Sequence, residues 1–438
     1  MRGKLDANFR DAGERELKNI ARPVRVYQLQ QPGRAMEAPV LALPEKPSIA
    51  VLLFQNLSGD PEQEYFADGM VEDIITGLSR IKWLFVIARN STFTYKGRAV
   101  DVKQVGRELG VRYVLEGSVR KAADRVRITG QLIDASTGAN VWAERYDRRL
   151  EDIFALQDEI TLSVVGAIEP SLRDAEIERV KHTRPDSLDA YDLALRAIPN
   201  VYVAMPDEVG KALPLLESAL AFQPDYALVH GLLAWCHEVL FVRAGFKEEN
   251  RTAAIRHAKA AIAGGRDDAT ALALGAFVIG MVAHDRVAAI EAFERAVTLS
   301  PSSAFTLFAG SCSLAWAGEA ERAIEWAERA LRISPNDRLN YLAYHALALA
   351  HFLRGRYTDA AGAARRSVDS NPGFSVSHSL LAAPLVRLGS LEEANAETAQ
   401  VLSLQPSFSA RGFCTALALP AMLADPLAKA WREAGLPP

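Results

Sequence analysis

Prolines at regular intervals are the feature of this sequence that most restricts its fold. In the C-terminal half, prolines that close a helix-like apolar pattern stand at Pro224, Pro301, Pro335, Pro372 and Pro406. The last four are 34, 37 and 34 residues apart. The residue twelve positions before each of the five is an alanine: Ala212, Ala289, Ala323, Ala360 and Ala394. This period predicts a stack of similar units, none of which can bury its apolar face alone.

A small residue marks the turn inside three of these units. Gly318, Gly355 and Gly389 each lie five residues before the alanine, whereas Asp207 and His284 hold that position in the other two units. We therefore predict two helices per unit, packed so closely that only alanine fits where they cross. The proline then ends the second helix, because it cannot continue the backbone hydrogen bonding.

These features resemble tetratricopeptide repeats, whose unit is a helical hairpin of about 34 residues. The 77 residues from Pro224 to Pro301 have room for two units, with residues 264–267 making the turn in place of a proline. We expect about six hairpins over residues 188–436, the last of them atypical. The resemblance implies a superhelix that holds a protein partner in its groove.

Residues 47–173 have the pattern of a small mixed α/β domain. The apolar run 49–54 predicts a strand buried on both faces, and the apolar spacing between Phe66 and Ile81 predicts a helix lying on it. Residues 83–88 predict a second strand, followed by a short helix striped by Val102, Val105 and Leu109.

Three further segments, 113–120, 125–134 and 139–146, alternate in polarity and predict a meander of strands. A long helix striped from Leu150 to Ile168 leads toward the repeats. The expected fold class is therefore a multidomain chain, in which a small mixed α/β domain of strands with flanking helices precedes an all-α superhelix of tetratricopeptide repeats.

The α/β segment also resembles a known family. The run FQNLSGDPEQEYFADGMVEDIITGLSRI and the stretch from ELGVRYVLEGSVRK to FALQDEI are similar to the domain called TolB N-terminal-like or FlgO-like. In bacteria such a domain often joins a class III adenylate cyclase, or a winged-helix regulator, to a tetratricopeptide array. The resemblance brings no catalytic residues with it.

The N-terminal segment GERELKNIARPVRVYQL, Gly13 to Leu29, resembles the last helix-turn and edge strand of a class III nucleotide cyclase. Its residues predict a capped turn, a break at Pro23 and a strand from Val24 to Leu29. We therefore assign residues 1–30 to a cyclase remnant and the proline-rich residues 31–46 to a linker.

The cyclase resemblance stops short of the catalytic parts. The two metal-binding aspartates, the base-selecting residues and the transition-state arginine and asparagine have no counterparts in this sequence. Without paired carboxylates for two Mg²⁺ ions, the ribose hydroxyl is not activated and the triphosphate is not neutralised. We expect no catalytic residues, no cofactor and no cyclase activity from the chain as given, and a catalytic domain that is lost, encoded separately or removed by a late start codon.

Composition restricts the partners and the compartment. The 438 residues carry 50 basic and 54 acidic side chains, so no overall positive field favours nucleic acid. The three cysteines show no metal-binding or disulfide spacing, which favours free thiols in a reducing compartment. The longest apolar run, 271–283, is too short to span a bilayer, and the N-terminus is too charged for a secretory signal. We expect a cytoplasmic protein without a membrane span.

Two sets of residues are binding candidates. Aromatic residues in the first helices of the hairpins are candidates for holding a partner in the groove: Tyr226, Trp235, Phe305, Phe308, Tyr341, Tyr344 and Phe352. Those helices contain no lysine, so we expect an apolar or aromatic partner surface and no clamp for a terminal carboxylate. Near the ends of predicted strands, the ligand candidates are Arg89, Ser91, Ser118 and Arg120.

Metal sites are less favoured by the spacing. The acidic loop from Asp60 to Asp68 has Tyr65 where a calcium-binding loop needs glycine, so capping of the following helix is favoured. His230 with His237, and His345 with His351, are each seven residues apart, which does not match a zinc motif. No metal ligands are predicted.

The function that follows is a non-catalytic regulatory and protein-interaction module, corresponding to the C-terminal half of a class III adenylate cyclase. In this interpretation the repeats bind a protein and the α/β domain senses a signal. The alternative is a subunit that completes a cyclase in trans, with a cyclase catalytic domain as its partner. A transcriptional adaptor is a weaker third hypothesis, because no helix-turn-helix precedes Pro47.

Overall fold

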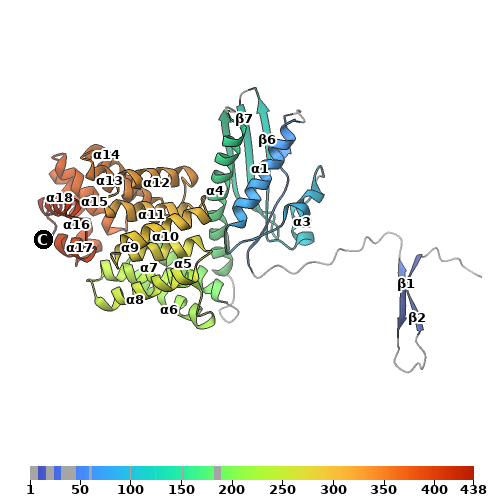
Figure 1. Cartoon of the computed structure of the whole chain (residues 1–438), viewed down its shortest axis with the longest axis horizontal. Coiled ribbons are helices and arrows are strands. Elements are labelled where there is room, and N and C mark those ends of the chain that lie inside the picture. The colour runs from blue at the N-terminus through green and yellow to red at the C-terminus, as the bar shows by residue number, and fades with distance from the viewer. Residues whose placement is uncertain are drawn as a thin grey trace, which may run out of the picture.

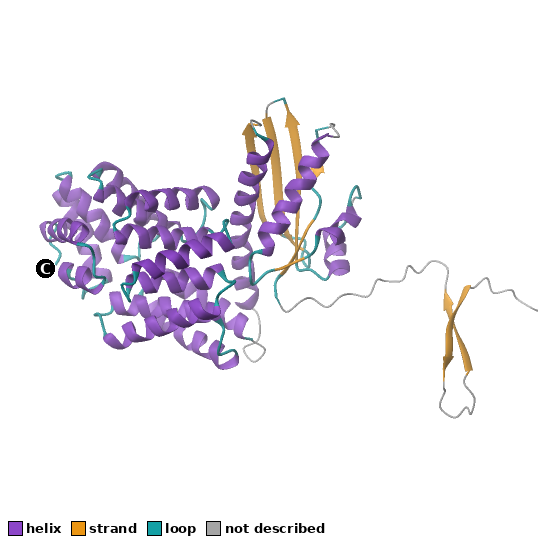
Figure 2. Cartoon of the chain, viewed as in Figure 1, coloured by secondary structure: helices purple, strands orange, loops and turns teal. Residues whose placement is uncertain are grey.

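The structure is a computed structural model, and it describes residues 8–15, 24–30, 46–58, 62–98, 100–123, 125–149, 152–181 and 189–438. Figure 1 shows a sheet with helices on one side of a long helix, α4, and a helical array on the other side. Figure 2 separates the two parts by secondary structure: strands in the α/β part, helices alone in the array. The predicted fold class is confirmed.

The N-terminal segment forms a hairpin of its own. Strands β1 (Asn8–Arg15) and β2 (Val24–Gln30) are antiparallel, with Asn8 opposite Gln30 and Arg15 opposite Val24. The strand predicted after Pro23 is present. The residues from Gly13 to Arg15, expected in a turn, belong instead to β1 because they pair with β2. The rest of the predicted turn, residues 16–23, lies outside the described residues.

The α/β domain contains one mixed sheet with strand order β5-β3-β6-β7-β8, and β4 also pairs with β6. Strands β3 and β4 run parallel to β6, whereas β6, β7 and β8 are antiparallel neighbours. The strands are β3 (Ser48–Val51), β4 (Gln55–Asn56), β5 (Phe85–Val86), β6 (Tyr113–Ala122), β7 (Arg125–Asp134) and β8 (Asn140–Arg149). The predicted meander is confirmed.

The two predicted buried strands are shorter than expected. Pairing stops after Val51 and resumes at Gln55, and β5 covers only two residues of the predicted segment 83–88. Leu52 and Phe54 are nevertheless buried, because they pack into the cores on either side of the sheet. Their apolar side chains indicate that these residues are buried. The sequence pattern does not show whether a buried residue also pairs in a strand.

Two long helices cover one face of the sheet. Helices α1 (Glu62–Ser79) and α4 (Ile153–Lys181) lie so close that a Cβ at Gly77 would come within 2.9 Å of Val165. On the opposite face, α2 (Arg89–Thr92), the 3-10 turn Phe93–Tyr95 and α3 (Val102–Leu109) pack beside β3 and the start of β6. Among the described residues, this packing leaves β7, β8 and most of β6 uncovered on that face.

The array consists of helix pairs. The pairs are α5 (Ala190–Val203) with α6 (Pro206–Phe222), α7 (Ala227–Arg243) with α8 (Glu248–Gly264), α9 (Ala269–Met281) with α10 (Arg286–Leu299), α11 (Ala304–Ala317) with α12 (Ala320–Ile333), α13 (Asn340–Leu353) with α14 (Tyr357–Ser370), α15 (Ser375–Arg387) with α16 (Leu391–Leu404), and α17 (Ala410–Ala416) with α18 (Ala421–Glu433). The described residues 189–438 thus hold seven pairs, one more than predicted. The extra pair was missed because no proline-terminated pattern marks α17 and α18.

The predicted packing inside each unit is confirmed. All five alanines at the helix crossings are fully buried: Ala212, Ala289, Ala323, Ala360 and Ala394. Gly318, Gly355 and Gly389 have φ of +90°, +70° and +81°, which glycine adopts without strain. His284 occupies the same turn position with φ +64°. Its ring nitrogen Nε2 lies 3.0 Å from the Ala416 carbonyl oxygen, and this contact holds the turn.

The first helices of the pairs form a closed interior. Every residue of α11 from Ala304 to Trp316 is buried. Contacts join repeats that are far apart in sequence: the Gln405 side chain donates to the Val242 carbonyl at 3.2 Å, and the Tyr202 and Phe305 rings are 6.3 Å apart. The groove predicted to hold a protein partner is therefore filled by the chain's own side chains.

Helix α4 joins the two parts of the molecule. Its residues Ile160, Val164 and Ile168 pack in the core of the sheet. A Cβ at Gly166, on the same helix, would come within 2.0 Å of Ile333 in the array. Glu176 is fully buried and accepts hydrogen bonds from Arg112 at 2.6 and 2.8 Å. The sheet and the array are therefore one block built around a shared helix.

Candidate functional site

The uncovered face of the sheet carries alternating polar residues. On β6, Glu116, Ser118 and Arg120 point to this face, because Leu115 and Val119 point into the core on the other side. Thr129 lies directly opposite Ser118 on the neighbouring strand β7. A sheet face that is packed on one side only keeps such polar residues in solvent.

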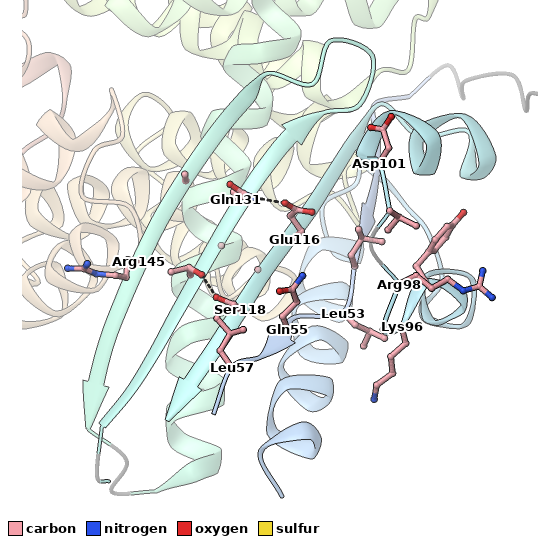
Figure 3. A pocket seen from close by; sticks show the side chains of 18 of the residues that line it. Leu53, Gln55, Leu57, Lys96, Arg98, Asp101, Glu116, Ser118, Gln131 and Arg145 are labelled. Carbon is pink, nitrogen blue, oxygen red and sulfur yellow. Dashed lines mark hydrogen bonds between the residues drawn. The ribbon is translucent and has the colours of Figure 1, made fainter. Parts of the chain in front are cut away.

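A cavity of about 1150 Å³ lies over this face, between the strands and the segment that follows α2. Figure 3 shows Glu116 beside Gln131 and, one step along the sheet, Ser118 beside its β7 partner. The Gln131 amide donates to the Glu116 carboxylate, and the Ser118 and Thr129 hydroxyl oxygens are 2.6 Å apart. These pairs form a polar floor for the cavity.

The wall opposite the strands comes from residues 95–98 and 100–101. Tyr95 donates from its hydroxyl to Glu108 at 2.6 Å, and burial together with this carboxylate raises the pKa of Tyr95 to about 12. The same hydrogen bond from Tyr95 lowers the pKa of Glu108. Lys96 bonds to Glu64 and Asp68, both at 2.9 Å, and these bonds raise the pKa of Lys96. The wall is thus held by charged contacts to α1 and α3.

Strand β8 contributes charged side chains to the edge of the cavity. Arg145 lines the cavity, and its Nε lies 3.2 Å from Asp147 on the same strand. Asp147 also accepts a hydrogen bond from Arg127 at 2.6 Å, and this bond is the main cause of its lowered pKa. The cavity therefore offers hydroxyls, amides and both signs of charge, which suits a polar ligand or a polar partner surface.

Only part of the predicted ligand set lies at this cavity. Ser118 lines it, and Arg120 is exposed on the same face of β6. Arg89 and Ser91 belong to the short helix α2 instead. Arg89 lies 4.2 Å from the centre of the Phe93 ring and 3.3 Å from Glu72. Arg89 and Ser91 therefore do not line this cavity, because the chain leaves the sheet after β5 and forms a helix.

The aromatic candidates are mostly interior residues. Five of them are at least 95% buried and lie in the core of the array: Trp235, Phe305, Phe308, Tyr341 and Phe352. The rings of Trp235 and Phe305 are 5.9 Å apart. These five are therefore unavailable to a partner, because the array closes around them. Tyr226 and Tyr344 are only partly buried, and each lines a surface cleft.

Two of the predicted histidines make contacts between helices of the array. His345 accepts a hydrogen bond from the Trp316 indole at 3.0 Å, and burial lowers the pKa of His345 to about 3. His230 and His257 bring their Nδ1 atoms within 2.9 Å of each other between α7 and α8. In the described part of the chain, no three His, Cys, Asp or Glu side chains are placed to hold a metal ion.

Sequence reasoning missed most of the cavity residues. Glu116, Thr129, Gln131 and Arg145 were not singled out, although polar residues alternate with apolar ones along the predicted strands. That alternation is the signal for a solvent-facing side of a sheet. The decisive fact, that no helix covers this side, appears only in the folded chain.

Comparison with known proteins supports the repeats and a relation to cyclases. The family model for subunit 3 of the anaphase-promoting complex, or cyclosome, matches residues 316–397. A protein of Rhizobium meliloti (strain 1021) named "Putative adenylate cyclase 3" is 47% identical over 270 residues, which is 60% of this chain and 46% of that protein. The chain thus spans about half the length of this relative. In the described residues, no helix is long and apolar enough to cross a membrane.

Solved structures match parts of the chain at low overall similarity. TolB from Acinetobacter baumannii has 21% identity and a TM-score of 0.23, covering 30% of this chain and 29% of that chain. The Cut9-Hcn1 hetero-tetramer of APC/C has 13% identity and a TM-score of 0.39, covering 64% of this chain and 49% of that chain. The family model and the Rhizobium relative show that the chain carries repeats of the tetratricopeptide type and is related to a protein named as an adenylate cyclase.

Proposed function

We propose that this chain is the regulatory and protein-interaction part of a class III adenylate cyclase-type protein. The observation that carries the proposal is the 47% identity over 270 residues to a protein named as an adenylate cyclase. The segment from Gly13 to Leu29 supports it independently, because it resembles the end of a cyclase catalytic domain. The proposed setting is the cytoplasm, where the three free cysteines stay reduced.

In this proposal the domains follow the limits expected from the sequence. Residues 1–30 are the cyclase end, residues 31–46 a linker, residues 47–173 a TolB N-terminal-like domain and residues 188–436 the repeat array. The polar cavity on the sheet serves as the sensing site of the α/β domain. The outer surface of the array serves as the partner site, since its interior is closed.

The block around α4 provides a route between these sites. Gly166 and Glu176 fix α4 to the array and to β6, so a ligand that shifts the sheet also shifts the array. Such coupling needs a ligand with different affinity for two arrangements of the block. In this proposal the regulatory signal passes through the contacts that join the sheet, α4 and the array.

The test joins a cyclase catalytic domain, taken from the Rhizobium meliloti relative, to the N-terminus of this chain. Cyclic AMP formation from ATP with Mg²⁺ or Mn²⁺ is measured for the fusion and for the separate parts. We expect no turnover by this chain alone, and a rate in the fusion that changes with Arg145→Glu at the cavity while Glu217→Gln on α6 has no effect. Turnover by the chain alone, or a fusion rate indifferent to the cavity variant, would contradict the proposal.

The hairpin β1–β2 favours a second candidate, in which the chain completes a cyclase in trans. Its strand β2 includes Val24 to Leu29, the end of the segment that resembles a cyclase end, and pairs with β1. In this case, mixing the separate catalytic domain with the chain raises cyclic AMP formation, and deletion of residues 1–30 removes the gain. The first candidate requires the covalent connection, so mixing leaves the rate unchanged.

A further inference from the structure

A cleft of about 620 Å³ opens on the outside of the array between α12, α13 and α14. These helices are labelled side by side at the top of the array in Figure 1. The floor of the cleft is formed by Tyr344, Leu347 and His351 of α13, and the walls by residues of the two flanking helices. Tyr344 is one of the two aromatic candidates that are not buried in the core.

The register of the repeats explains why the cleft opens here. Three positions after the buried alanine, the second helix of a pair presents a side chain to the first helix. In three other pairs this residue is large: Trp326 contacts Gly310, His257 contacts His230, and Glu397 lies 2.6 Å from His378. In the pair α9–α10 the residue at this position is Ala292.

In the pair α13–α14 the corresponding residue is Ala363, and its neighbour is Gly362. A Cβ added at Gly362 would meet no atom within 4 Å. The space that an indole, imidazole or carboxylate occupies in other repeats is therefore open in this one. The geometry of the array leaves room for a side chain that the chain itself does not supply.

Charge is distributed unequally along the cleft. Because adjacent helices are antiparallel, Arg332 of α12 and Arg366 of α14 lie at the Tyr344 end. The Arg366 guanidinium is 5.7 Å from the centre of the Tyr344 ring. Glu328 and Asp359 line the other end, near His351. Burial and the charge of Arg356 lower the pKa of His351, and the two carboxylates oppose this lowering. The cleft is thus basic at one end and acidic at the other.

His351 supplies an independent sign of a binding site. Its Nδ1 atom is buried and has no hydrogen-bond partner among the described residues. Leaving a buried polar atom without a partner is unfavourable, and a bound group that pairs with it recovers that free energy. The cleft therefore has an apolar floor, opposite charges at its ends and an unused hydrogen-bonding group.

We propose that this cleft binds a partner peptide that inserts an aromatic side chain beside Ala363, with an acidic residue toward Arg332 and Arg366 and a basic residue toward Glu328 and Asp359. The inserted ring takes the place that Trp326 holds in the preceding repeat. This inference rests on the proposed protein-interaction role of the array. It assigns that role to an outer cleft, since the interior of the array is filled.

The experiment uses the full chain labelled with ¹⁵N-glycine and a capped synthetic peptide, acetyl-Glu-Ala-Ala-Trp-Ala-Ala-Lys-amide. We expect a saturable shift of the Gly362 amide resonance, and no shift with the peptide in which alanine replaces the tryptophan. In the variant Ala363→Trp the chain's own indole fills the cleft, so the shift is lost. The matched variant Ala363→Ser leaves the cleft open and retains the shift.

Circular dichroism checks that the Ala363→Trp variant is folded. The variant Arg366→Glu gives a second test that does not depend on filling the cleft. Reversal of this charge weakens binding of the peptide by about threefold, the size expected for one exposed ion pair. Binding that is absent in the wild type, or equal in Ala363→Trp, overturns the inference. None of these measurements depends on cyclic AMP formation. Peptide binding in the cleft can therefore be disproved while the regulatory proposal stands, and the regulatory proposal can be disproved while the cleft inference stands.

Discussion

For individual side chains in this molecule, burial often shifts the pKa away from the ordinary value for the residue type. Glu169 of α4 is 7% exposed at the boundary between the sheet and the array, and burial raises its pKa from 4.5 to about 7. The nearby Arg173 opposes this shift, and Asp337 adds to it. Because the folded state binds this proton more tightly than the unfolded state, stability falls as pH rises from about 4.5 to about 7.

We predict that Glu169→Gln stabilises the chain at pH 8 by an amount on the order of 2 kcal/mol, since glutamine carries no charge to desolvate. At pH 4.5 or below the gain disappears, because Glu169 is then protonated in the folded state. Urea unfolding at both pH values measures the difference. The exposed Glu217→Gln on α6 is the control, and an equal gain at the two pH values would contradict the assignment.

At the scale of elements, the repeats hold together through matched large and small residues. Gly310 of α11 lies under the Trp326 ring of α12, and a Cβ at Gly310 would come within 2.4 Å of it. The same logic places alanine where the helices cross and glycine at most turns. Where the match is relaxed, at Ala363, the outer cleft opens.

We predict that Gly310→Ala lowers the free energy of unfolding by about 1–3 kcal/mol, because the added methyl group overpacks the helix pair. Combining it with Trp326→Leu costs less than the sum of the single changes, because the clash is then relieved. Thermal unfolding of the two single variants and the double variant measures the coupling. Strict additivity would show that the two residues do not touch.

At the scale of the whole molecule, one buried carboxylate joins the sheet to the array. Glu176 of α4 accepts hydrogen bonds from Arg112, from the Tyr113 hydroxyl at 2.8 Å and from Arg179 at 2.9 Å. Arg179 in turn donates to Asp192 of α5 at 2.9 Å. This network connects β6, α4 and the first helix of the array.

We predict that Glu176→Gln destabilises the chain by about 3–5 kcal/mol, the range for removing one partner of a buried ion pair. Hydrogen exchange speeds up in both β6 and α5, since the network spans them. Glu159→Gln, which breaks the exposed pair with Arg148, changes stability by less than about 1 kcal/mol and serves as the control. Faster exchange confined to β6 would show that the two parts are not coupled through Glu176.

The fold class, the helix pairs and the meander of strands could be predicted from the amino-acid sequence. These depend on local patterns: the spacing of Pro335 and Pro372, the buried Ala323 and Ala360, and the polarity of residues 113–134. Such patterns indicate which faces of an element are apolar, because residues three or four apart share a helix face and residues two apart share a side of a strand. The turn at His284, where a side chain replaces glycine, was found from the same register.

Only the tertiary structure decided which apolar faces are closed and which polar faces stay open. Trp235 and Tyr341 are aromatic residues of the kind that line a binding groove. Contacts between distant repeats nevertheless bury both side chains. Ser118 lies at a cavity because, among the described residues, α2 and α3 cover this face of the sheet only beside β3 and the start of β6. These outcomes depend on how successive helix pairs rotate relative to one another and on contacts between residues more than 100 positions apart. Local sequence patterns carry no signal for either.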